Sequence, residues 1–382
     1  MRAVPALTVY LLVPLALLTA TVAGTIAVAA GATPPEGYYT LQDFRRVEKI
    51  DAHMHVHGPA DRLMAQAIAD NFRILTINVD APDYPPIRDQ QLAAISLRKR
   101  YPGRVAFAAT FSVEGFQHPG WSAAVLQDID AVVAQGAVGV KIWKNIGMVL
   151  RDVDGSYVMP DDVRLEPIIG HLEREHLVLL GHQAEPRNCW LPLEQMTVRS
   201  DREYFEAHPQ YYMHLHPEMP SQEAILAARD EMLRTHPSLR FDAVHLASLE
   251  WDVDRVADFL ERFPNASVDM AARLVHLEYQ AASQPEKVRR FLISYQDRVL
   301  YGSDDAYGPG DSDSRPVEEV HTDWLNDWRF LVTSDRMHSA DFDAGFRGLH
   351  LPRAVVDKIY RRNAEALFPS AWSMTPTRQA IR

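Results

Sequence analysis

Residues 49–58 read KIDAHMHVHG, in which three histidines, His53, His55 and His57, alternate with apolar side chains. In a β-strand, alternate residues point to the same side, so these imidazoles would crowd together. Such crowding is typical of a metal site, and equally of a histidine-rich strand at the surface. The choice between the two depends on where other polar side chains fall along the chain.

Short runs rich in β-forming residues alternate along the chain with longer amphipathic stretches. Eight such runs occur, at 47–55, 73–80, 104–112, 137–144, 177–183, 241–248, 266–272 and 298–305. Between them, apolar residues recur at three- and four-residue spacing, which predicts helices at 61–72, 127–136, 165–176 and 254–264. This α/β alternation predicts a (β/α)8 TIM barrel over residues 34–370. A doubly wound open sheet is the alternative, and it does not need eight similar units.

Ionisable residues come at the end of these runs rather than at random places in them. The residues at these ends are His53, His55, Lys141, Lys144, His182, His245 and Asp304. In a TIM barrel the carboxyl ends of all strands meet at one rim, which is where active sites lie. We therefore expect these side chains to lie close together.

Imidazole and carboxylate groups are suitable ligands for a borderline divalent ion. His53 and His55 can reach one ion from one strand face, and His182 and Asp304 would complete the set. Such an ion lowers the pKa of a bound water to about 7, and a neighbouring carboxylate can take the proton released. Each residue alone has an ordinary structural interpretation, but the joint pattern favours a metal site.

Composition excludes several other classes of protein. The formal net charge is −12 with no block of Lys and Arg, so a nucleic-acid partner is not expected. The only cysteine is Cys189, which rules out an intramolecular disulfide and a thiolate metal cluster.

The N-terminus predicts export. After Arg2 no charged residue occurs before Glu36, and residues 1–33 are interpreted as a signal peptide or an N-terminal membrane anchor. The expected location is therefore periplasmic or secreted, with membrane attachment if the segment is not cleaved. Residues 371–382 are expected to form a C-terminal tail.

Candidate substrate contacts are Arg273, Arg187, Trp190 and His214. Arg273 follows the seventh strand, where its guanidinium could face a substrate carboxylate, and a structural ion pair is the alternative. The other three lie in a long insertion between the fifth and sixth strands, which looks like a loop over one face of the barrel. His57 is expected beyond the first strand, either supporting the site or exposed to solvent.

Seven stretches together resemble the amidohydrolase superfamily, in its amidohydrolase-related (family 2) branch. They are DAHMH, VGVKIWK, LLGHQAEP, AVHLASLEWDVDRV, VDMAAR, LYGSDDAYGP and IYRRNAEALF, and they span roughly residues 45–370. The first motif alone is weak, whereas the later histidines and GSDD in the same order make the resemblance specific.

The resemblance implies a divalent metal held by His53, His55, His182 and Asp304. It implies that His245 either activates water or donates a proton beside one metal, or binds a second metal. A carboxylated lysine bridges two metals in binuclear members, and Lys141 stands at that position, with Lys144 close by as the alternative. The expected cofactor is zinc, as one ion or two.

The leading functional prediction is a metal-dependent hydrolase that attacks an amide, ester or lactone carbonyl of a small molecule. Asp304 would shuttle the proton, and His245 or the metal would stabilise the oxyanion. A metal-dependent decarboxylase of an aromatic or unsaturated acid is the alternative, because the same branch includes such lyases. A metal- or ligand-binding protein without turnover is a third hypothesis. A homodimer is the default assembly.

Overall fold

The computed structural model describes residues 37–82, 84–308 and 314–372. Parallel strands follow one another around a barrel, each paired with the next in chain order. These are β1 (Lys49–Val56), β2 (Phe72–Ile77), β3 (Val105–Thr110), β4 (Gly139–Ile142), β5 (Val178–Gly181), β6 (Arg240–Ala243), β7 (Ala266–Asp269) and β8 (Val299–Leu300). They coincide with the eight runs predicted from the sequence, so the predicted TIM-barrel fold is confirmed.

The barrel closes between its last strand and its first. β8 is short, and the chain continues from it into β9 (Ala306–Tyr307), which pairs in parallel with β1. Between these two pieces, the amide of Ala52 donates to the carbonyl of Tyr301 at 3.0 Å, and the amide of Asp304 donates to the carbonyl of His53 at 2.8 Å. β8 and β9 therefore act as two parts of one eighth strand.

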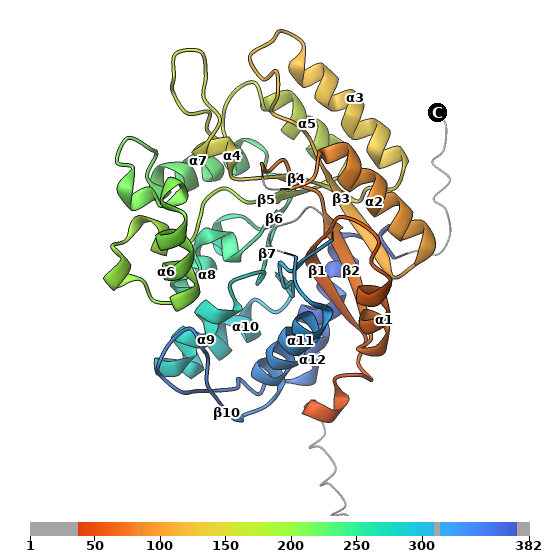
Figure 1. The fold of residues 1–382 in the computed structure, drawn as a ribbon, viewed down its shortest axis with the longest axis vertical. Coiled ribbons are helices and arrows are strands. Elements are labelled where there is room, and N and C mark those ends of the chain that lie inside the picture. The colour runs from red at the N-terminus through yellow and green to blue at the C-terminus, as the bar shows by residue number, and fades with distance from the viewer. Residues whose placement is uncertain (1–36, 83, 309–313, 373–382) are drawn as a thin grey trace, which may run out of the picture. The chain divides into compact units, whose positions relative to one another are not determined.

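Helices cover the outside of the barrel (Figure 1). The longer ones are α1 (Asp61–Ala69), α2 (Ile87–Arg100), α3 (Trp121–Ala134), α5 (Glu166–Arg174), α7 (Gln222–Thr235), α8 (Val253–Arg262), α9 (Leu274–Ser283), α10 (Pro285–Ser294) and α11 (Val317–Val332). α6 (Arg199–Ala207) is as long as α1, and the shorter helices are α4 (Asn145–Met148), α12 (Arg353–Asp357) and α13 (Asn363–Leu367). The four helical patterns expected from the sequence correspond to α1, α3, α5 and α8.

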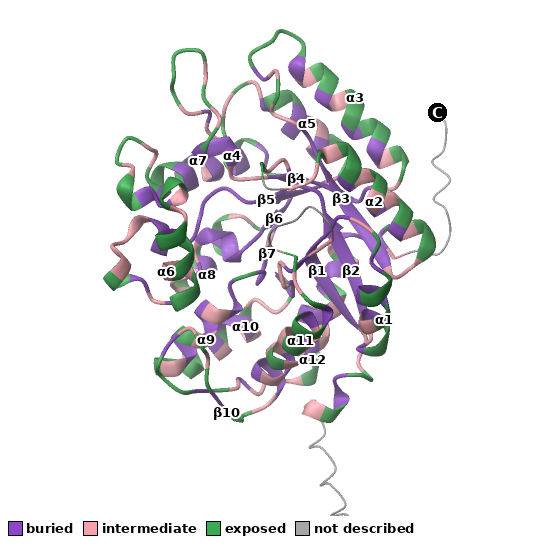
Figure 2. Ribbon diagram, in the orientation of Figure 1, coloured by how far each residue is buried: buried purple, intermediate pink, exposed green. Residues whose placement is uncertain are grey.

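Apolar side chains pack on both sides of the strands. One buried cluster includes Ile50, Leu75, Leu180 and Leu300, which come from strands all around the barrel and therefore fill its interior. A larger cluster joins the outer strand faces, such as Met54 on β1, to the surrounding helices. Figure 2 shows the strands buried along their length, while the helices expose their outward sides.

A bulge in β1 decides where the histidines point. Pairing with β2 is regular up to Asp51 and resumes at Met54 with one extra residue on β1. A one-residue insertion reverses the alternation of a strand. Ile50 faces the interior before the bulge, and His53 and His55 can face it afterwards.

Strict alternation along β1 would place Asp51 on the same face as His53, but the bulge between Asp51 and Met54 puts it on the other face. Its Oδ2 accepts a hydrogen bond from Nε1 of Trp324 on α11 at 2.8 Å, on the helix side of the barrel. Its Oδ1 accepts from the amide of His53 at 3.1 Å. Asp51 therefore supports the strand backbone at the bulge instead of lining the pocket.

The insertion between β5 and β6 is folded rather than a simple loop. It contains α6 and α7, and the start of α6 is hydrogen-bonded to a distant part of the chain. The amides of Arg199 and Ser200 donate to the carbonyl and the carboxylate of Asp341, at 2.9 and 2.8 Å.

Two predictions concern the N-terminal and C-terminal segments of the chain. The predicted signal peptide or anchor at residues 1–33 lies outside the described residues, as do residues 373–382 of the predicted tail at 371–382. Among the residues that the structure describes, no helix is both long and apolar enough to cross a bilayer.

Candidate metal centre and active site

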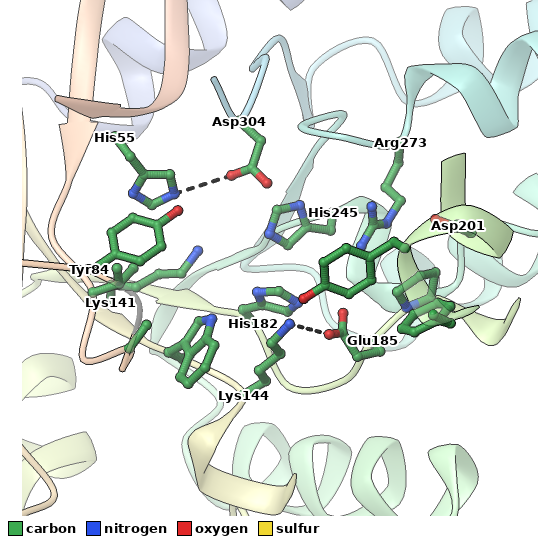
Figure 3. A pocket seen from close by; sticks show the side chains of 16 residues that line it. His55, Tyr84, Lys141, Lys144, His182, Glu185, Asp201, His245, Arg273 and Asp304 are labelled. Atoms are coloured by element: carbon green, nitrogen blue, oxygen red, sulfur yellow. Dashed lines mark hydrogen bonds and ion pairs between the residues drawn. The ribbon is translucent and has the colours of Figure 1, made fainter. Parts of the chain in front are cut away.

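The carboxyl ends of the strands surround a pocket of about 300 Å³. Seven residues singled out from the sequence line it, namely His55, Lys141, Lys144, His182, His245, Arg273 and Asp304 (Figure 3). They come from five different strand ends and the start of α9. The prediction that these polar residues meet at one rim is confirmed.

Asp304 lies between the two histidines of β1. Its Oδ1 lies 3.2 Å from Nε2 of His53 and 3.2 Å from Nε2 of His55. Asp304 has a positive φ of 72°, a conformation that aspartate tolerates better than most residues. This turn, between β8 and β9, brings the carboxylate back over β1.

The hydrogen bonds on the far side of each ring fix its protonation. Nδ1 of His53 donates to Oδ2 of Asp269 at 2.6 Å, and Nδ1 of His55 donates to the carbonyl of Ile77 at 2.8 Å. In the neutral rings each Nε2 therefore presents a lone pair. Both lone pairs face Oδ1 of Asp304, which is also an acceptor.

Three acceptor atoms this close together favour a positive charge between them, beyond the Lys141 ammonium that lies 3.3 Å from Nε2 of His53. Extra protons on the rings are disfavoured, because burial, together with the nearby Lys141 ammonium, lowers the pKa of His53. Burial alone would raise the pKa of Asp304, but the surrounding histidines hold it well below its usual range. This donor set, two imidazoles and one ionised carboxylate, fits a divalent metal ion.

His245 and His182 complete the ring of imidazoles. Nδ1 of His245 donates to the carbonyl of Ala271 at 2.8 Å, so its Nε2 also presents a lone pair. One ligand atom from each of His53, His245 and Asp304 lies within 4.8 Å of the others, which is compact enough for one ion. Nε2 of His182 is buried and has no hydrogen-bond partner among the described residues, as expected for an imidazole that binds a metal ion.

Burial keeps these last two rings neutral. It lowers the pKa of both His182 and His245 well below the ordinary value for histidine. Their ring centroids lie 4.2 Å apart, so each would also repel a charge on the other. Neutral imidazole is the form that binds metals or accepts a proton.

A left-handed turn aims His245 into the pocket. Residues 245–248 all have a positive φ, between 53° and 59°, although none is glycine. Such backbone costs roughly 1–2 kcal/mol per residue, so the surroundings must hold it in place. Arg229 donates from Nη1 to the carbonyl of Ala247 at 2.5 Å, and the hydroxyl of Ser248 donates to the carbonyl of Ala184 at 2.7 Å.

Asp269 is a functional residue that the sequence reasoning missed. It lies at the end of β7, fully buried, with Oδ2 on Nδ1 of His53. Its Oδ1 accepts from the amides of His245 and Ala271, at 2.7 and 3.2 Å. Asp269 lies at a strand end, as Asp304 does. The rule that identified Asp304 from the sequence would therefore have identified Asp269 too.

Lys141 lies where a ligand of a second metal ion, or a carboxylated lysine that bridges two metal ions, is expected. Its Nζ is 3.3 Å from Nε2 of His53. Burial lowers the pKa of Lys141 to about 8, against the opposing effect of Asp269 and Asp304, so a fraction of this lysine is neutral near physiological pH. The neutral amine is the form that carboxylation requires.

Lys144 also lines the pocket, so it stays an alternative to Lys141. Strand alternation does not apply to it, because β4 ends at Ile142. Its ammonium forms an ion pair with the carboxylate of Glu185.

The four proposed substrate contacts are placed differently. Arg273 lines the pocket, whereas Arg187 lines a separate surface depression and lies over the ring of Trp251. Trp190 packs in an apolar cluster of the insertion, and His214 is exposed. The insertion instead lines the pocket through three residues of α6, which are Asp201, Tyr204 and Phe205.

His57 lies past the end of β1, as expected, but it is buried. Its ring lies 6.0 Å from that of His55 and 4.8 Å from that of Tyr84, centroid to centroid. Of the two positions expected for it, solvent exposure is wrong and a supporting place behind His55 fits.

Comparison with known proteins gives a family and several distant structures. Residues 50–370 match the sequence model of a family described as amidohydrolase. An uncharacterised TIM-barrel protein from Bordetella bronchiseptica is 14% identical, with a TM-score of 0.48 over 85% of this chain and 99% of that chain. A 2,6-dihydroxybenzoate decarboxylase from Rhizobium is 14% identical, with a TM-score of 0.48 over 84% and 98%. Amidohydrolase 2 from Bifidobacterium longum subsp. infantis is 11% identical, with a TM-score of 0.43 over 85% and 99%. No curated protein has a significant match to the chain.

Proposed function

This chain belongs to the amidohydrolase family matched by residues 50–370, and on that premise we propose that it hydrolyses an amide, ester or lactone bond of a small molecule. Membership makes it a metal-dependent enzyme, of the hydrolase or the decarboxylase kind. The choice of hydrolysis depends on how the pocket would handle water.

The position of Asp304 is the observation that supports hydrolysis. Its Oδ1 is the atom near His53 and His55, while Oδ2 has no hydrogen bond or ion pair with any described residue. The side chain is 28% exposed, and the residue lines the pocket. One oxygen can therefore contact the metal while the other accepts a proton from an attacking water.

A metal held by His53, His55, His182 and Asp304 would supply an activated water and polarise the substrate carbonyl. Asp304 accepts the water proton through Oδ2 and passes it to the leaving group. A ligand atom of His245 lies within 4.8 Å of those of His53 and Asp304, where it can accept a proton, bind a metal ion or hold the reacting group in place.

Zinc is the metal that we propose. The donor set is rich in neutral imidazole, which suits zinc, and contains no thiolate. One ion could be held without Lys141, whereas two would include both Lys141 and His245 as ligands.

The test combines metal counting with turnover. Enzyme loaded with zinc should release an alcohol or amine from a panel of small esters, lactones and amides. Asp304→Asn should reduce kcat by about 10²–10⁴, because it removes the proton acceptor, while the three histidines still retain metal. Asp254→Asn, which alters an exposed carboxylate on α8, is the matched control and should keep full activity.

Two results would overturn this proposal. One is a preparation that holds no divalent metal and gains no activity with zinc or manganese. The other is release of CO₂ from a panel of carboxylic acids, with no hydrolysis of the esters, lactones and amides, which would assign the decarboxylase activity instead.

A further inference from the structure

One wall of the pocket comes from α6 and not from the barrel strands. Asp201, Tyr204 and Phe205 of this helix line the pocket, and Figure 3 shows Asp201 on the side away from His55. None of the proposed metal ligands lies on α6, so this wall faces the part of a substrate beyond its reacting group. Two of the three side chains are aromatic, which favours contact with an apolar part of that substrate.

α6 has little in its own sequence to hold it in place. Val198 precedes the helix and offers no side-chain hydrogen bond to its first turn. Of the nine residues in the helix, Phe205 alone is buried. A short helix with one buried side chain and no N-cap of its own depends on other parts of the chain for its position.

Asp341 supplies the missing cap from the C-terminal part of the chain. Its carbonyl accepts a hydrogen bond from the amide of Arg199 at 2.9 Å, and its Oδ1 accepts from the amide of Ser200 at 2.8 Å. Amides in the first turn of a helix have no partner within that helix, and a carboxylate there is also favoured by the helix dipole. Asp341 therefore acts as an N-cap residue that belongs to another segment.

Aromatic contacts hold the segment that carries Asp341. The buried ring of Phe342, the next residue, lies 5.5 Å from the ring of Tyr279 on α9 and 5.6 Å from that of Phe346, centroid to centroid. The ring of Phe346 lies 5.6 Å from that of Phe330 on α11. Figure 1 shows this part of the chain, in blue, beside α9. The position of Asp341 is therefore set by α9 and α11.

α6 has a second attachment, which lies at the pocket itself. Oδ2 of Asp201 accepts a hydrogen bond from Nδ2 of Asn188 at 2.8 Å and lies 3.4 Å from Nε2 of His276 on α9. This attachment remains when Asp341 is changed. Loss of the cap should therefore loosen the pocket wall without unfolding the insertion.

We propose that Asp341 is a positioning residue for substrate binding, which acts by fixing α6 as the wall that contacts an apolar part of the substrate. The inference rests on the proposed function only for the nature of the reaction. Any ligand that binds the metal and extends to α6 depends on Asp341 in the same way.

The experiment compares acetohydroxamate and phenylacetohydroxamate on the zinc-loaded full chain. Both bind zinc through the hydroxamate group, and they differ only in a phenyl ring that can reach α6. Calorimetry measures their dissociation constants for the unmodified enzyme and for the variants. We expect phenylacetohydroxamate to bind the unmodified enzyme more tightly than acetohydroxamate. In Asp341→Ala its dissociation constant should rise about fivefold, while that of acetohydroxamate stays the same.

Two further variants separate the cap from other effects of the change. Asp341→Asn keeps an oxygen that can accept from the amide of Ser200, so it should restore most of the affinity for phenylacetohydroxamate. It removes the same negative charge as Asp341→Ala, and with it the same effect on Glu278. Asp252→Ala removes the cap of α8, where Oδ1 accepts from the amide of Asp254 at 3.1 Å, and should change neither affinity.

Hydrolysis gives an independent measurement. On an ester with the same phenyl extension, methyl phenylacetate, Asp341→Ala should raise KM and leave kcat unchanged. This is the result for a group that contributes to binding alone.

Four results would overturn the inference. The first is an unmodified enzyme that binds both hydroxamates equally, which requires no variant to fold. The second is an Asp341→Ala variant that weakens both hydroxamates by the same factor, or neither. The third is an Asp341→Asn variant as weak as Asp341→Ala, and the fourth is the same loss in Asp252→Ala. Asp341-dependent binding of phenylacetohydroxamate without any ester hydrolysis would reject the proposed function alone.

Discussion

At the scale of single residues, the site depends on the far nitrogen of each imidazole. An acceptor holds Nδ1 of His53, His55 and His245, so that Nε2 of each ring is left for the pocket. Asp269 contributes most to this arrangement, because its two oxygens hold the ring of His53 and the backbone of His245. One buried carboxylate therefore orients two of the histidines.

Replacing Asp269 with Asn should weaken metal binding. The amide can still accept a hydrogen bond from the backbone of His245, but its NH₂ group can no longer accept the proton on Nδ1 of His53. We expect zinc affinity to fall about 10–100-fold, as is typical when a carboxylate behind a histidine ligand is lost. Competition with a chromogenic chelator measures this change.

Ser267→Ala, on the same strand, is the control for Asp269→Asn and should leave zinc affinity unchanged. Equal zinc affinity in the Asp269→Asn variant and the unmodified enzyme would show that His53 does not depend on this hydrogen bond. A fall in both variants would point to damage to β7 as a whole.

Strand ends identified His182, His245 and Asp304 from the sequence because the carboxyl ends of a barrel converge whatever the details of the loops. The same rule did not help with Arg187, chosen for its closeness in sequence to a strand end, or with His214, chosen because it lies in the insertion. A folded insertion carries residues away from that end, and α6 brings others back from further along the chain. The positions of side chains on such an insertion depend on how the insertion itself packs. The spacing of apolar residues in the sequence does not predict that packing.

At the scale of elements, the bulge in β1 and the approach of the eighth strand determine the shape of the site. The bulge turns His53 into the barrel, where its Cβ lies against the backbone of Gly302. A Cβ on Gly302 would lie 2.7 Å from Cβ of His53 and 3.3 Å from Cβ of Ala271. The glycine of the GSDD motif therefore allows a close approach, and the sequence shows the glycine without showing what it approaches.

Gly302→Ala should separate Asp304 from His53. The new methyl group cannot fit without a backbone shift, so we expect a loss of about 1–3 kcal/mol in unfolding free energy and much weaker zinc binding. Denaturant unfolding and zinc titration measure the two effects. Gly170→Ala on α5 is the control, because the nearest atom to its Cβ would be the flexible end of Arg174 at 3.1 Å, and it should retain zinc binding. Normal zinc affinity in Gly302→Ala would contradict this account of the motif.

The left-handed turn at 245–248 is a second local feature that the sequence does not predict. Nothing in the letters His-Leu-Ala-Ser favours a positive φ, and tertiary hydrogen bonds that involve Arg229, Ser248 and Asp269 sustain it. The run 241–248 could be recognised as a strand, but β6 ends at Ala243.

At the scale of the whole barrel domain, the segment around Asp341 connects the pocket to the C-terminal part of the chain. Asp341 accepts hydrogen bonds from the start of α6, and the next turns of α6 line the pocket. It also brings acidic groups together, because Asp341 acts on Glu278 of α9, and Glu278 acts on Asp327 of α11. Glu278, Asp327 and Asp341 therefore form a group of neighbouring acidic side chains between these elements, which is called the acidic seam below.

This seam should make the stability of the domain fall as pH rises. Burial, with the added effect of Asp341, raises the pKa of Glu278 from 4.5 to about 8. The folded state then binds more protons than the unfolded state between these two values, so the free energy of unfolding decreases as pH rises through that window. Glu278→Gln, which mimics the protonated acid, should raise Tm by about 2 °C or more at pH 8 and change it little at pH 5. Glu286→Gln, at an exposed glutamate of α10, should show no such pH dependence. A Tm difference between Glu278→Gln and the unmodified enzyme that is the same at both pH values would show that Glu278 is ionised in the folded protein throughout, and would remove the acidic seam as a source of alkaline instability.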